Sequence, residues 1–204
     1  RVGGHFHRRY ARTGQQTRNH RPDELSSVEH SFASERARRI LSRRIRVEQT
    51  FDDRHLRAIH YALFSPLYEW AGELRTYPLS KSGIPFAEPR EISTYLDLSR
   101  NHIRTVAWDS LGRPEFAAEI ATVFAWINTA HPFREGNGRA SKVLLSQLAG
   151  QAGYYLDYSE VTAAEWNSAS MLSMPDLGSF DPVPDTLVPV FARIATPLSP
   201  EHKP

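Results

Sequence analysis

Residues 131–139 read His-Pro-Phe-Arg-Glu-Gly-Asn-Gly-Arg, and residues 140–145 then begin a helical pattern. Two glycines therefore lead the backbone into a helix N-terminus. Unpaired N–H groups and the positive end of the helix macrodipole make such a place a ready site for a phosphate. Because a potential base (His131) and a carboxylate (Glu135) lie in the same stretch, it predicts chemistry on a nucleotide phosphate.

The candidate base and the candidate metal ligand each have a plainer alternative. His131 has to be neutral to accept a proton, and a lone histidine at this place would more simply cap or pack. Glu135 is placed to hold Mg²⁺, which takes few protein carboxylates and completes its shell with phosphate and water. Alternatively, Glu135 is a surface carboxylate that stabilises a helix start.

The remaining polar residues of the stretch predict an anion site. The N–H groups of Gly136 and Gly138 would bind an α-phosphate with Asn137 as an added side-chain donor, although both glycines also suit an ordinary turn. Arg139 and Lys142 lie three positions apart on the first turn of the following helix, so they can face one ligand together. No Walker motif occurs in the chain.

Composition limits the class of protein. The chain has 204 residues, of which 40% are hydrophobic and 24% charged, as expected for one globular domain. No apolar run is long enough to span a membrane or to form a secretory signal. The absence of cysteine excludes disulfides, thiolate metal sites and a cysteine nucleophile, and it fits a reducing compartment. The first residue is Arg1 rather than Met, which is compatible with an excised fragment of a larger protein or with a processed form.

The net charge is only +2, and the positive charge is concentrated in two segments of the chain. Residues 1–21 contain six arginines and no acid, and a second group of six follows: Arg36, Arg38, Arg39, Arg43, Arg44 and Arg46. One interpretation is a nucleic-acid surface. We favour the other, a solvated basic tail or linker (1–21) and the outer face of a helix, so nucleic acid is a disfavoured partner.

The rest of the chain predicts a single, mainly α domain over residues 22–196. Apolar residues at helical spacing predict helices over the following segments: from Pro22 to about 41 (Leu25, Val28, Phe32, Ile40, Leu41), from Asp52-Asp53 to Tyr68–Gly72, 90–107, from Pro114 to about 130, 139–152, from the capping box at Thr162, and 185–195 with Pro189 in or near its first turn. Residues 74–86 predict one β-hairpin around the turn signal 80–83. Residues 197–204 are expected to be a C-terminal tail.

At this point the sequence resembles the Fic (Fido) domain family, whose signature is H-x-F-x-[DE]-G-N-G-R-x-x-R. The chain matches every fixed position except the last, where Lys142 replaces arginine. The Tyr-Glu-Trp-Ala-Gly segment at 68–72 and the hairpin also look like family members. The resemblance implies a Fic-type helical bundle with one β-hairpin flap.

The resemblance also implies protein adenylylation, with ATP as substrate and Mg²⁺ as cofactor. His131 would deprotonate a Tyr, Thr or Ser hydroxyl of a target protein, and Glu135 would hold the metal. The phosphate-binding residues would be Gly136, Asn137, Gly138, Arg139 and Lys142. Ile84 and Phe86 of the flap would dock the target segment by strand addition.

Lys142 keeps alternatives open, because lysine retains the charge but loses the planar bidentate fork of arginine. The alternatives are transfer of UMP or phosphocholine, nucleotide binding without transfer, and a basic nucleic-acid-binding module. The related kinases carry lysine where Gly138 stands here, so the intact Gly-Asn-Gly argues against phosphate transfer.

Many family members are silenced by a helix with the motif [ST]-x-x-x-E-[GN]. Ser31–Glu35 and Ser65–Glu69 match its first part, but Arg36 and Trp70 follow, so neither completes it. The chain thus resembles members that a separate, small helical antitoxin inhibits through its own glutamate, or members not inhibited in this way. A toxin in the cytoplasm and an effector delivered into a host or competitor cell both fit; a membrane partner does not.

Overall fold

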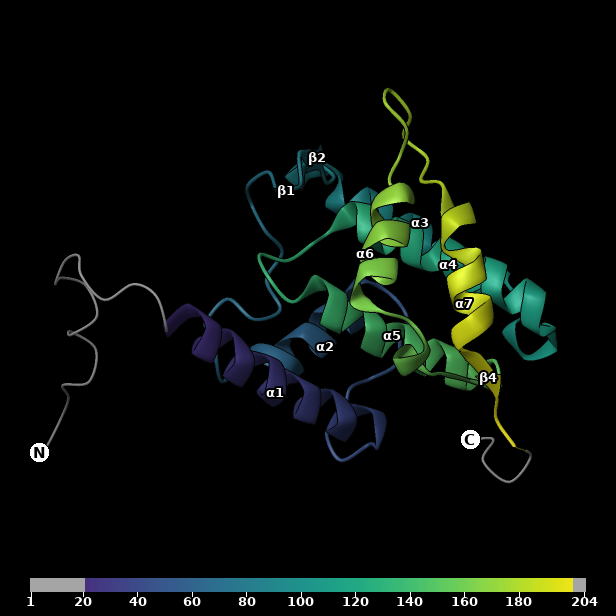
Figure 1. Cartoon of the computed structure of the whole chain (residues 1–204), viewed down its shortest axis with the longest axis horizontal. Helices are drawn as coiled ribbons and strands as arrows, with labels where there is room; N and C mark the ends of the chain where they lie inside the picture. The colour runs from purple at the N-terminus through teal and green to yellow at the C-terminus, as the bar shows by residue number, and fades with distance from the viewer. Residues whose placement is uncertain (1–20, 200–204) are drawn as a thin grey trace, which may run out of the picture.

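The computed structural model describes residues 21–199, and side chains from residue 29 onward. Its helices are α1 (Arg21–Leu41), α2 (Asp53–Phe64), α3 (Ile92–Thr105), α4 (Arg113–Ala130), α5 (Asn137–Gln151), α6 (Ala163–Leu172) and α7 (Val188–Ile194) (Figure 1). Two antiparallel pairs of short strands accompany them: β1 (Ser80–Lys81) with β2 (Ile84–Pro85), and β3 (Tyr154–Leu156) with β4 (Ala195–Pro197). The mainly α architecture confirms the predicted fold class. Most of the basic tail, the side chains of Leu25 and Val28, and residues 200–204 lie outside the described residues.

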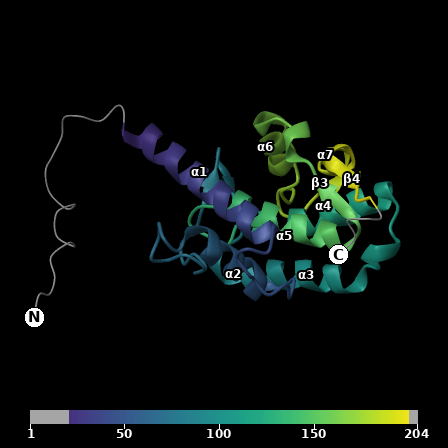
Figure 2. The same cartoon turned by 90° about the horizontal axis from the view of Figure 1, so that it is seen from below.

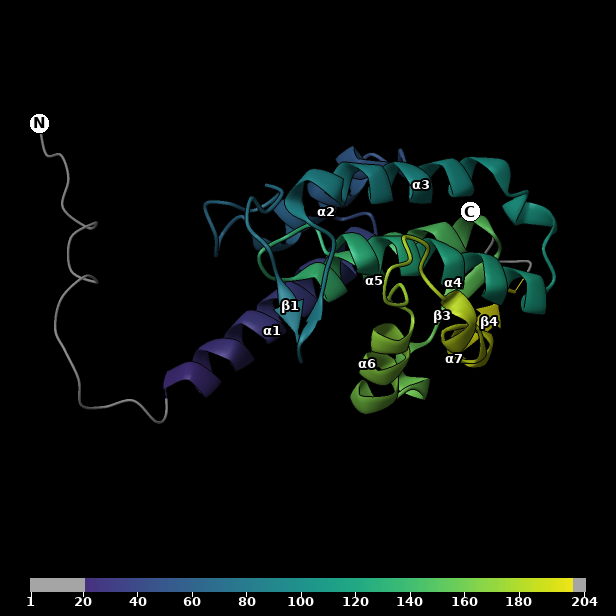
Figure 3. The same ribbon diagram turned by 90° about the horizontal axis from the view of Figure 1, so that it is seen from above.

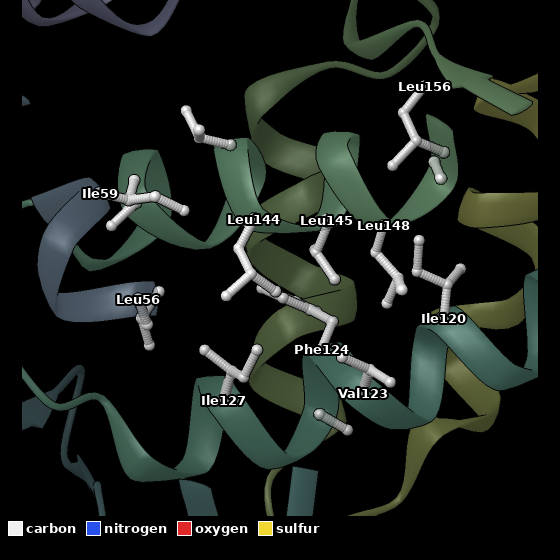
Figure 4. Packing of buried hydrophobic residues seen from close by; sticks show 14 of the residues in the cluster. Leu56, Ile59, Ile120, Val123, Phe124, Ile127, Leu144, Leu145, Leu148 and Leu156 are labelled. Carbon is white, nitrogen blue, oxygen red and sulfur yellow. The ribbon is translucent and has the colours of Figure 1, made fainter. Parts of the chain in front are cut away.

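Helices α4 and α5 form the centre of the core. Pro114 lies in the first turn of α4, where its missing N–H costs no hydrogen bond, as predicted. Figure 4 shows the apolar face of α4 against that of α5, through Ile120, Val123, Phe124, Ile127, Leu144, Leu145 and Leu148, all 5% exposed or less. Each such side chain contributes about 1.5–3 kcal/mol through burial. This pairing fixes the end of α4 beside the start of α5, where the 131–139 stretch connects them.

The other helices surround this pair. α3 runs along α4 in Figure 3, and α7 packs on α4 from another direction. α1 packs against α5 and α2, as Figure 2 shows. α6 and the β1–β2 hairpin stand on the same side of the α4–α5 junction (Figure 1), and Lys81 Nζ of the hairpin donates to Asn167 Oδ1 of α6 at 3.3 Å. The junction is thereby enclosed by the hairpin, α6 and α1.

The hairpin is tighter than the turn signal suggested. Ser82 and Gly83 both have left-handed φ angles, 52° and 82°, which is the pattern of a two-residue type I′ turn. Two residues on each side pair, Ser80 with Pro85 and Lys81 with Ile84.

Two details of the secondary-structure prediction were wrong. α2 ends at Phe64 instead of reaching residues 68–72, because Pro66 cannot supply the N–H that a continuing helix needs. The β3–β4 pair was missed, since three-residue strands carry too few residues to show alternation. β4 includes Pro197, and the N–H of Leu198 donates to Gly153 O at 2.8 Å, so both residues are held against the core.

Other boundaries agree with the sequence. The capping box at Thr162 is formed with Glu165, and Pro189 lies in the first turn of α7. Across residues 21–199, none of the helices has the length and apolar character needed to cross a membrane.

Candidate active site

His131 ends α4 in an unusual backbone conformation. Its φ and ψ are 38° and 60°, in the left-handed region, and its N–H donates to Ile127 O. A non-glycine residue there costs about 1–2 kcal/mol, and such strain persists where the surroundings hold it. The conformation turns the histidine ring away from the helix axis and starts the glycine-containing loop.

Arg75 supplies much of the support for that conformation. Its side chain is 2% exposed and donates to four backbone carbonyls, two at the end of α4 (Ala130 and His131) and two at the base of the flap (Tyr77 and Ala87). A buried guanidinium is tolerated where its donors are satisfied in this way. Arg75 therefore ties the flap to the residue predicted to be the base.

The His131 ring is covered by the flap. Phe86 stacks on it with ring centroids 3.6 Å apart and planes 11° from parallel. Burial, together with the positive charges of Arg75 and Lys81, lowers the pKa of His131 to about 3. The imidazole is then neutral near pH 7, which is the form that can accept a proton.

A second histidine braces the loop. His60 Nδ1 accepts the N–H of Gly72 at 2.9 Å, so Nε2 carries the proton and donates to Glu135 O at 2.9 Å. The His60 ring is fully buried and stacks on Phe133 at 3.9 Å, and burial lowers its pKa to about 4. His60 is therefore a core histidine that supports the loop.

Asn137 and Gly136 shape the turn into α5. Asn137 Oδ1 accepts the N–H of Phe133, and its Nδ2 donates to Phe133 O, both at 2.8 Å. Its amide is therefore engaged by the loop backbone instead of being aimed outward. Gly136 has φ 80°, and a Cβ there would come within 2.4 Å of the Phe64 ring, so only glycine fits.

The start of α5 remains open to an anion. Its N-cap residue is Gly136, which has no side chain to satisfy the first N–H groups of the helix. Gly138 has open space in front of it, since a Cβ there would meet nothing within 4 Å. The N–H of Gly136 already donates to Glu135 Oε1 at 2.8 Å, so the N–H groups at the start of α5 itself are better placed as anion donors than Gly136 N–H or the Asn137 side chain.

Arg139 is held by two carboxylates. Its Nη2 lies 2.6 Å from Glu29 Oε1 and 3.3 Å from Glu135 Oε1. The Tyr68 hydroxyl donates to the other oxygen of Glu29 at 2.6 Å. Burial alone would raise the pKa of Glu29, but the hydrogen bonds from Tyr68 and Arg139 outweigh it and lower that pKa. Arg139 also lies over the Phe64 ring at 4.7 Å.

Lys142 has a different environment. Its Nζ lies 4.7 Å from the Tyr158 ring centroid and 4.6 Å from that of Trp166. The side chain is half-buried, burial lowers its pKa, and no carboxylate among the described side chains offsets this. The two glutamates of the incomplete inhibitory motifs are exposed, and Glu35 pairs with Arg38 of its own helix.

Two clefts meet at this junction. The flap cleft has a volume of about 120 Å³ and is lined by the flap, α4, α5 and α6, including Ile84, Phe86, His131 and Gly138. The α1–α6 cleft, of about 740 Å³, is lined by Glu29, Glu135, Gly136, Arg139 and Lys142 among others. Gly138, Trp166 and Asn167 line both clefts, so the cleft that contains the base and the cleft that contains the two cations are neighbours at the start of α5.

The residues suit one weakly held divalent cation. Among the described side chains, no three of His, Cys, Asp and Glu gather closely enough to hold a metal by themselves. Glu135 offers one carboxylate that is 61% exposed. Such a site fits Mg²⁺ with phosphate oxygens and water as its remaining ligands.

The structure brings the predicted motif residues together at this junction, and the two predicted flap residues, Ile84 and Phe86, lie beside it. Sequence reasoning missed Arg75, Glu29, Tyr158 and Trp166, which lie far from the motif in sequence and belong to no local pattern. In contrast, the arginines of the second basic group lie at the C-terminal end of α1 and in the following segment. Most of them are exposed there, as the solvated-face interpretation expects.

Comparison with known proteins gives the family. The family model described as Fic/DOC matches residues 50–149. The protein named "Probable protein adenylyltransferase y4lH" from Sinorhizobium fredii is 34% identical over 155 residues, which cover 74% of this chain and 77% of that protein. The chain belongs to the Fic/DOC family.

Another relative is much longer. The protein adenylyltransferase VbhT of Bartonella schoenbuchensis is 34% identical over 150 residues, which are 73% of this chain and 31% of VbhT. The Fic/DOC chain described here thus spans less than a third of VbhT.

Solved structures share the fold. One is BepC, a VirB-translocated effector protein of Bartonella tribocorum with bound AMPPNP. It matches this chain with a TM-score of 0.76 and 27% sequence identity, and the match covers 87% of this chain and 89% of the BepC chain. The N-terminal Fic domain of a Bep effector from Bartonella quintana, with bound ADP, has the same TM-score and identity, with 95% of each chain covered.

Proposed function

We propose that this chain is a protein adenylyltransferase that moves AMP from ATP to a hydroxyl side chain of a target protein. The observation that carries the proposal is that two neighbouring clefts share Gly138 in their linings. This arrangement puts a neutral, flap-covered His131 at one end and the open helix start with Arg139 and Lys142 at the other. Relatives named protein adenylyltransferase, and similar structures with bound AMPPNP or ADP, support the same activity.

The reaction follows from this order of residues. The target hydroxyl gives its proton to His131, and its oxygen forms a bond with the α-phosphorus of ATP. The bond from that phosphorus to the oxygen bridging to the β-phosphate breaks, and pyrophosphate leaves. The chain contributes positioning and charge stabilisation, which are the main requirements of such transfers.

Each phosphate-binding group has a place in this scheme. N–H groups at the start of α5, including that of Gly138, would hold the α-phosphate, and Arg139 would meet the next phosphate. Glu135 would hold Mg²⁺, which would neutralise phosphate charge. Asn137 contributes by fixing the loop through Phe133.

The flap would present the target. Ile84 of β2 lines the flap cleft. An extended target segment would pair with the edge of this hairpin as an added strand. Phe86 stacks on His131, so docking and the position of the base are linked through one side chain. The target hydroxyl would belong to Tyr, Thr or Ser.

Regulation and place of action extend the proposal. A small helical antitoxin would insert its glutamate into the α1–α6 cleft beside Lys142. BepC is a VirB-translocated effector. This chain would likewise act after delivery into another cell, or it would act as a toxin in the cytoplasm of the cell that produces it.

The direct test compares wild type with His131→Ala. Cell lysate is incubated with ATP labelled in the α-phosphate, and labelled protein is counted. We expect His131→Ala to lose label by at least about 1000-fold, since removal of the base also removes its positioning of the hydroxyl, with an unchanged melting curve. Label within tenfold of wild type would remove His131 from the mechanism. Parallel reactions with UTP and CDP-choline measure the competing transfers.

A further inference from the structure

Lys142 stands where the family motif has arginine, and its surroundings differ from those of the neighbouring Arg139. Within the described part of the chain it has no carboxylate partner. Instead its ammonium lies between two rings, 4.7 Å from the centroid of Tyr158 and 4.6 Å from that of Trp166. We call these two residues the aromatic pair.

The aromatic pair is rigidly supported. Its two rings meet edge to face, with centroids 5.4 Å apart and planes at 79°. Trp166 is 7% exposed and packs on Phe124 at 4.9 Å and on Phe191 at 5.7 Å, which belong to α4 and α7. Lys142 therefore contacts aromatic rings whose positions are fixed by packing against the core.

This arrangement stabilises a cation without using its hydrogen-bond donors. Half-burial disfavours the charged form of Lys142, and a positive charge in the first turns of α5 is opposed by the helix macrodipole. Two ring faces offset part of that cost. An ammonium has three N–H donors, and π faces satisfy none of them as a carboxylate would. Lys142 thus presents a localised but unpaired cation to the α1–α6 cleft.

We propose that Tyr158 and Trp166 are positioning residues that aim Lys142 at the terminal phosphate of the bound nucleotide. The proposal rests on the proposed function. Arginine at this place would bring a fixed planar fork, whereas lysine is a flexible point charge. The aromatic pair restores the lost orientation by restricting where the ammonium lies.

The proposed function assigns the α-phosphate to Gly138 and the next phosphate to Arg139, which leaves the terminal phosphate for Lys142. His131 lies in the flap cleft, Gly138 lines both clefts, and Lys142 lies in the α1–α6 cleft only. A triphosphate with its α-phosphate at Gly138, next to the base, extends toward Arg139 and then Lys142. A diphosphate bound in the same way ends before it reaches Lys142.

The test is nucleotide binding, measured by calorimetry with ATP and with ADP. Tyr158→Leu removes the ring, and Tyr158→Phe is the matched control that removes only the hydroxyl. We expect Tyr158→Leu to weaken ATP binding about tenfold, or about 1.4 kcal/mol, and ADP binding less than twofold. Tyr158→Phe should keep the ATP-to-ADP ratio of wild type. Equal weakening of both nucleotides, or the same effect from Phe and Leu, would overturn the proposal.

A double-mutant cycle adds a readout that a purely structural role would not move. Lys142→Met should abolish the ATP-to-ADP preference, and Tyr158→Leu added to it should cost nothing more in ATP binding. Additive losses would show that the ring acts independently of Lys142 and would also overturn the proposal. Melting curves of all variants check that they fold.

Failure of this proposal is distinguishable from failure of the proposed function. Wild type that prefers ATP to ADP and loses that preference in Tyr158→Leu, but transfers no AMP, contradicts the proposed function alone. Wild type that transfers AMP while Tyr158→Leu leaves the ATP-to-ADP ratio unchanged contradicts the aromatic pair alone.

Discussion

The first turns of α5 carry two cations that the molecule holds in opposite ways. On the α1 side, Arg139 lies between the carboxylates of Glu29 and Glu135. On the α6 side, Lys142 lies against the aromatic pair and has no carboxylate among the described residues. Both line the same cleft, and they are three positions apart in sequence.

The difference separates two tasks in one anion site. On the α1 side two carboxylates already occupy Arg139, so an arriving phosphate has to compete with them for that side chain. The α6 side is charge-unbalanced, and a phosphate there meets a cation whose donors are already available. We therefore expect carboxylate variants and aromatic variants to affect the reaction differently.

Among the groups around these two cations, the largest effect should come from Glu135, which serves both Arg139 and the proposed metal. We expect Glu135→Ala to lower AMP transfer at 1 mM Mg²⁺ by about 100-fold, with little change in stability, because the carboxylate is mostly exposed. Raising the Mg²⁺ concentration should recover part of the loss. Glu135→Asp keeps a carboxylate and serves as the matched control. An unchanged Mg²⁺ requirement in the alanine variant would disprove the metal role.

A middle effect should come from Glu29, which ties α1 to Arg139. We expect Glu29→Gln to lower the free energy of unfolding by about 1–2 kcal/mol, as for loss of a partly buried charge-assisted pair. Tyr68→Phe should cost less, since Glu29 then keeps Arg139. The folded pKa of Glu29 lies below its unfolded value of about 4.5, so this contribution is present above pH 4.5 and is lost as pH falls through the folded pKa. Denaturant titrations of both variants between pH 7 and pH 3 check this, and a difference from wild type that does not shrink as the pH falls would contradict it.

The smallest effect should be a pH shift. Positive charge on Lys81 helps to lower the pKa of His131, whereas Lys142 is not among its neighbouring charges. Lys81→Met should therefore move the acid limb of kcat/KM to higher pH by less than about half a unit, because Lys81 is exposed and screened. Asn167→Ala removes the hydrogen bond to Lys81 but keeps the charge of Lys81, so it should leave the acid limb of kcat/KM at the same pH. Lys142→Met should also leave the acid limb in place. A shift in either control, or none in Lys81→Met, would remove the electrostatic role of Lys81.

Features that depend on neighbouring residues could be predicted from the sequence. The apolar spacing of α4, the capping box of α6 and the glycine-rich junction all depend on residues within one or two turns of each other. Each of these was confirmed by the helix bounds. The end of α2 was misplaced because the effect of Pro66 was overlooked, and the β3–β4 pair was missed because its strands are too short for periodicity.

Long-range partners could not be predicted in the same way. Glu29 reaches Arg139 across 110 positions, and Arg75 reaches His131 across 56. A single charged residue at such a distance carries no local signal of its partner. The substitution at Lys142 was visible in the sequence, but its proximity to Tyr158 and Trp166 depends on the fold, which brings residues 16 and 24 positions away beside it. The site is thus recognisable from the motif, while its supports come from the fold.

The central claim, transfer of AMP rather than of a phosphate, is tested most directly by the position of the label. Wild type is incubated with lysate and ATP carrying the label in either the α- or the γ-phosphate, and labelled protein is measured in both reactions. We expect strong labelling from the α-phosphate and none from the γ-phosphate, with one pyrophosphate released for each AMP transferred. Labelling from the γ-phosphate, or no labelling from the α-phosphate in lysate that contains acceptor proteins for a related adenylyltransferase, would contradict it.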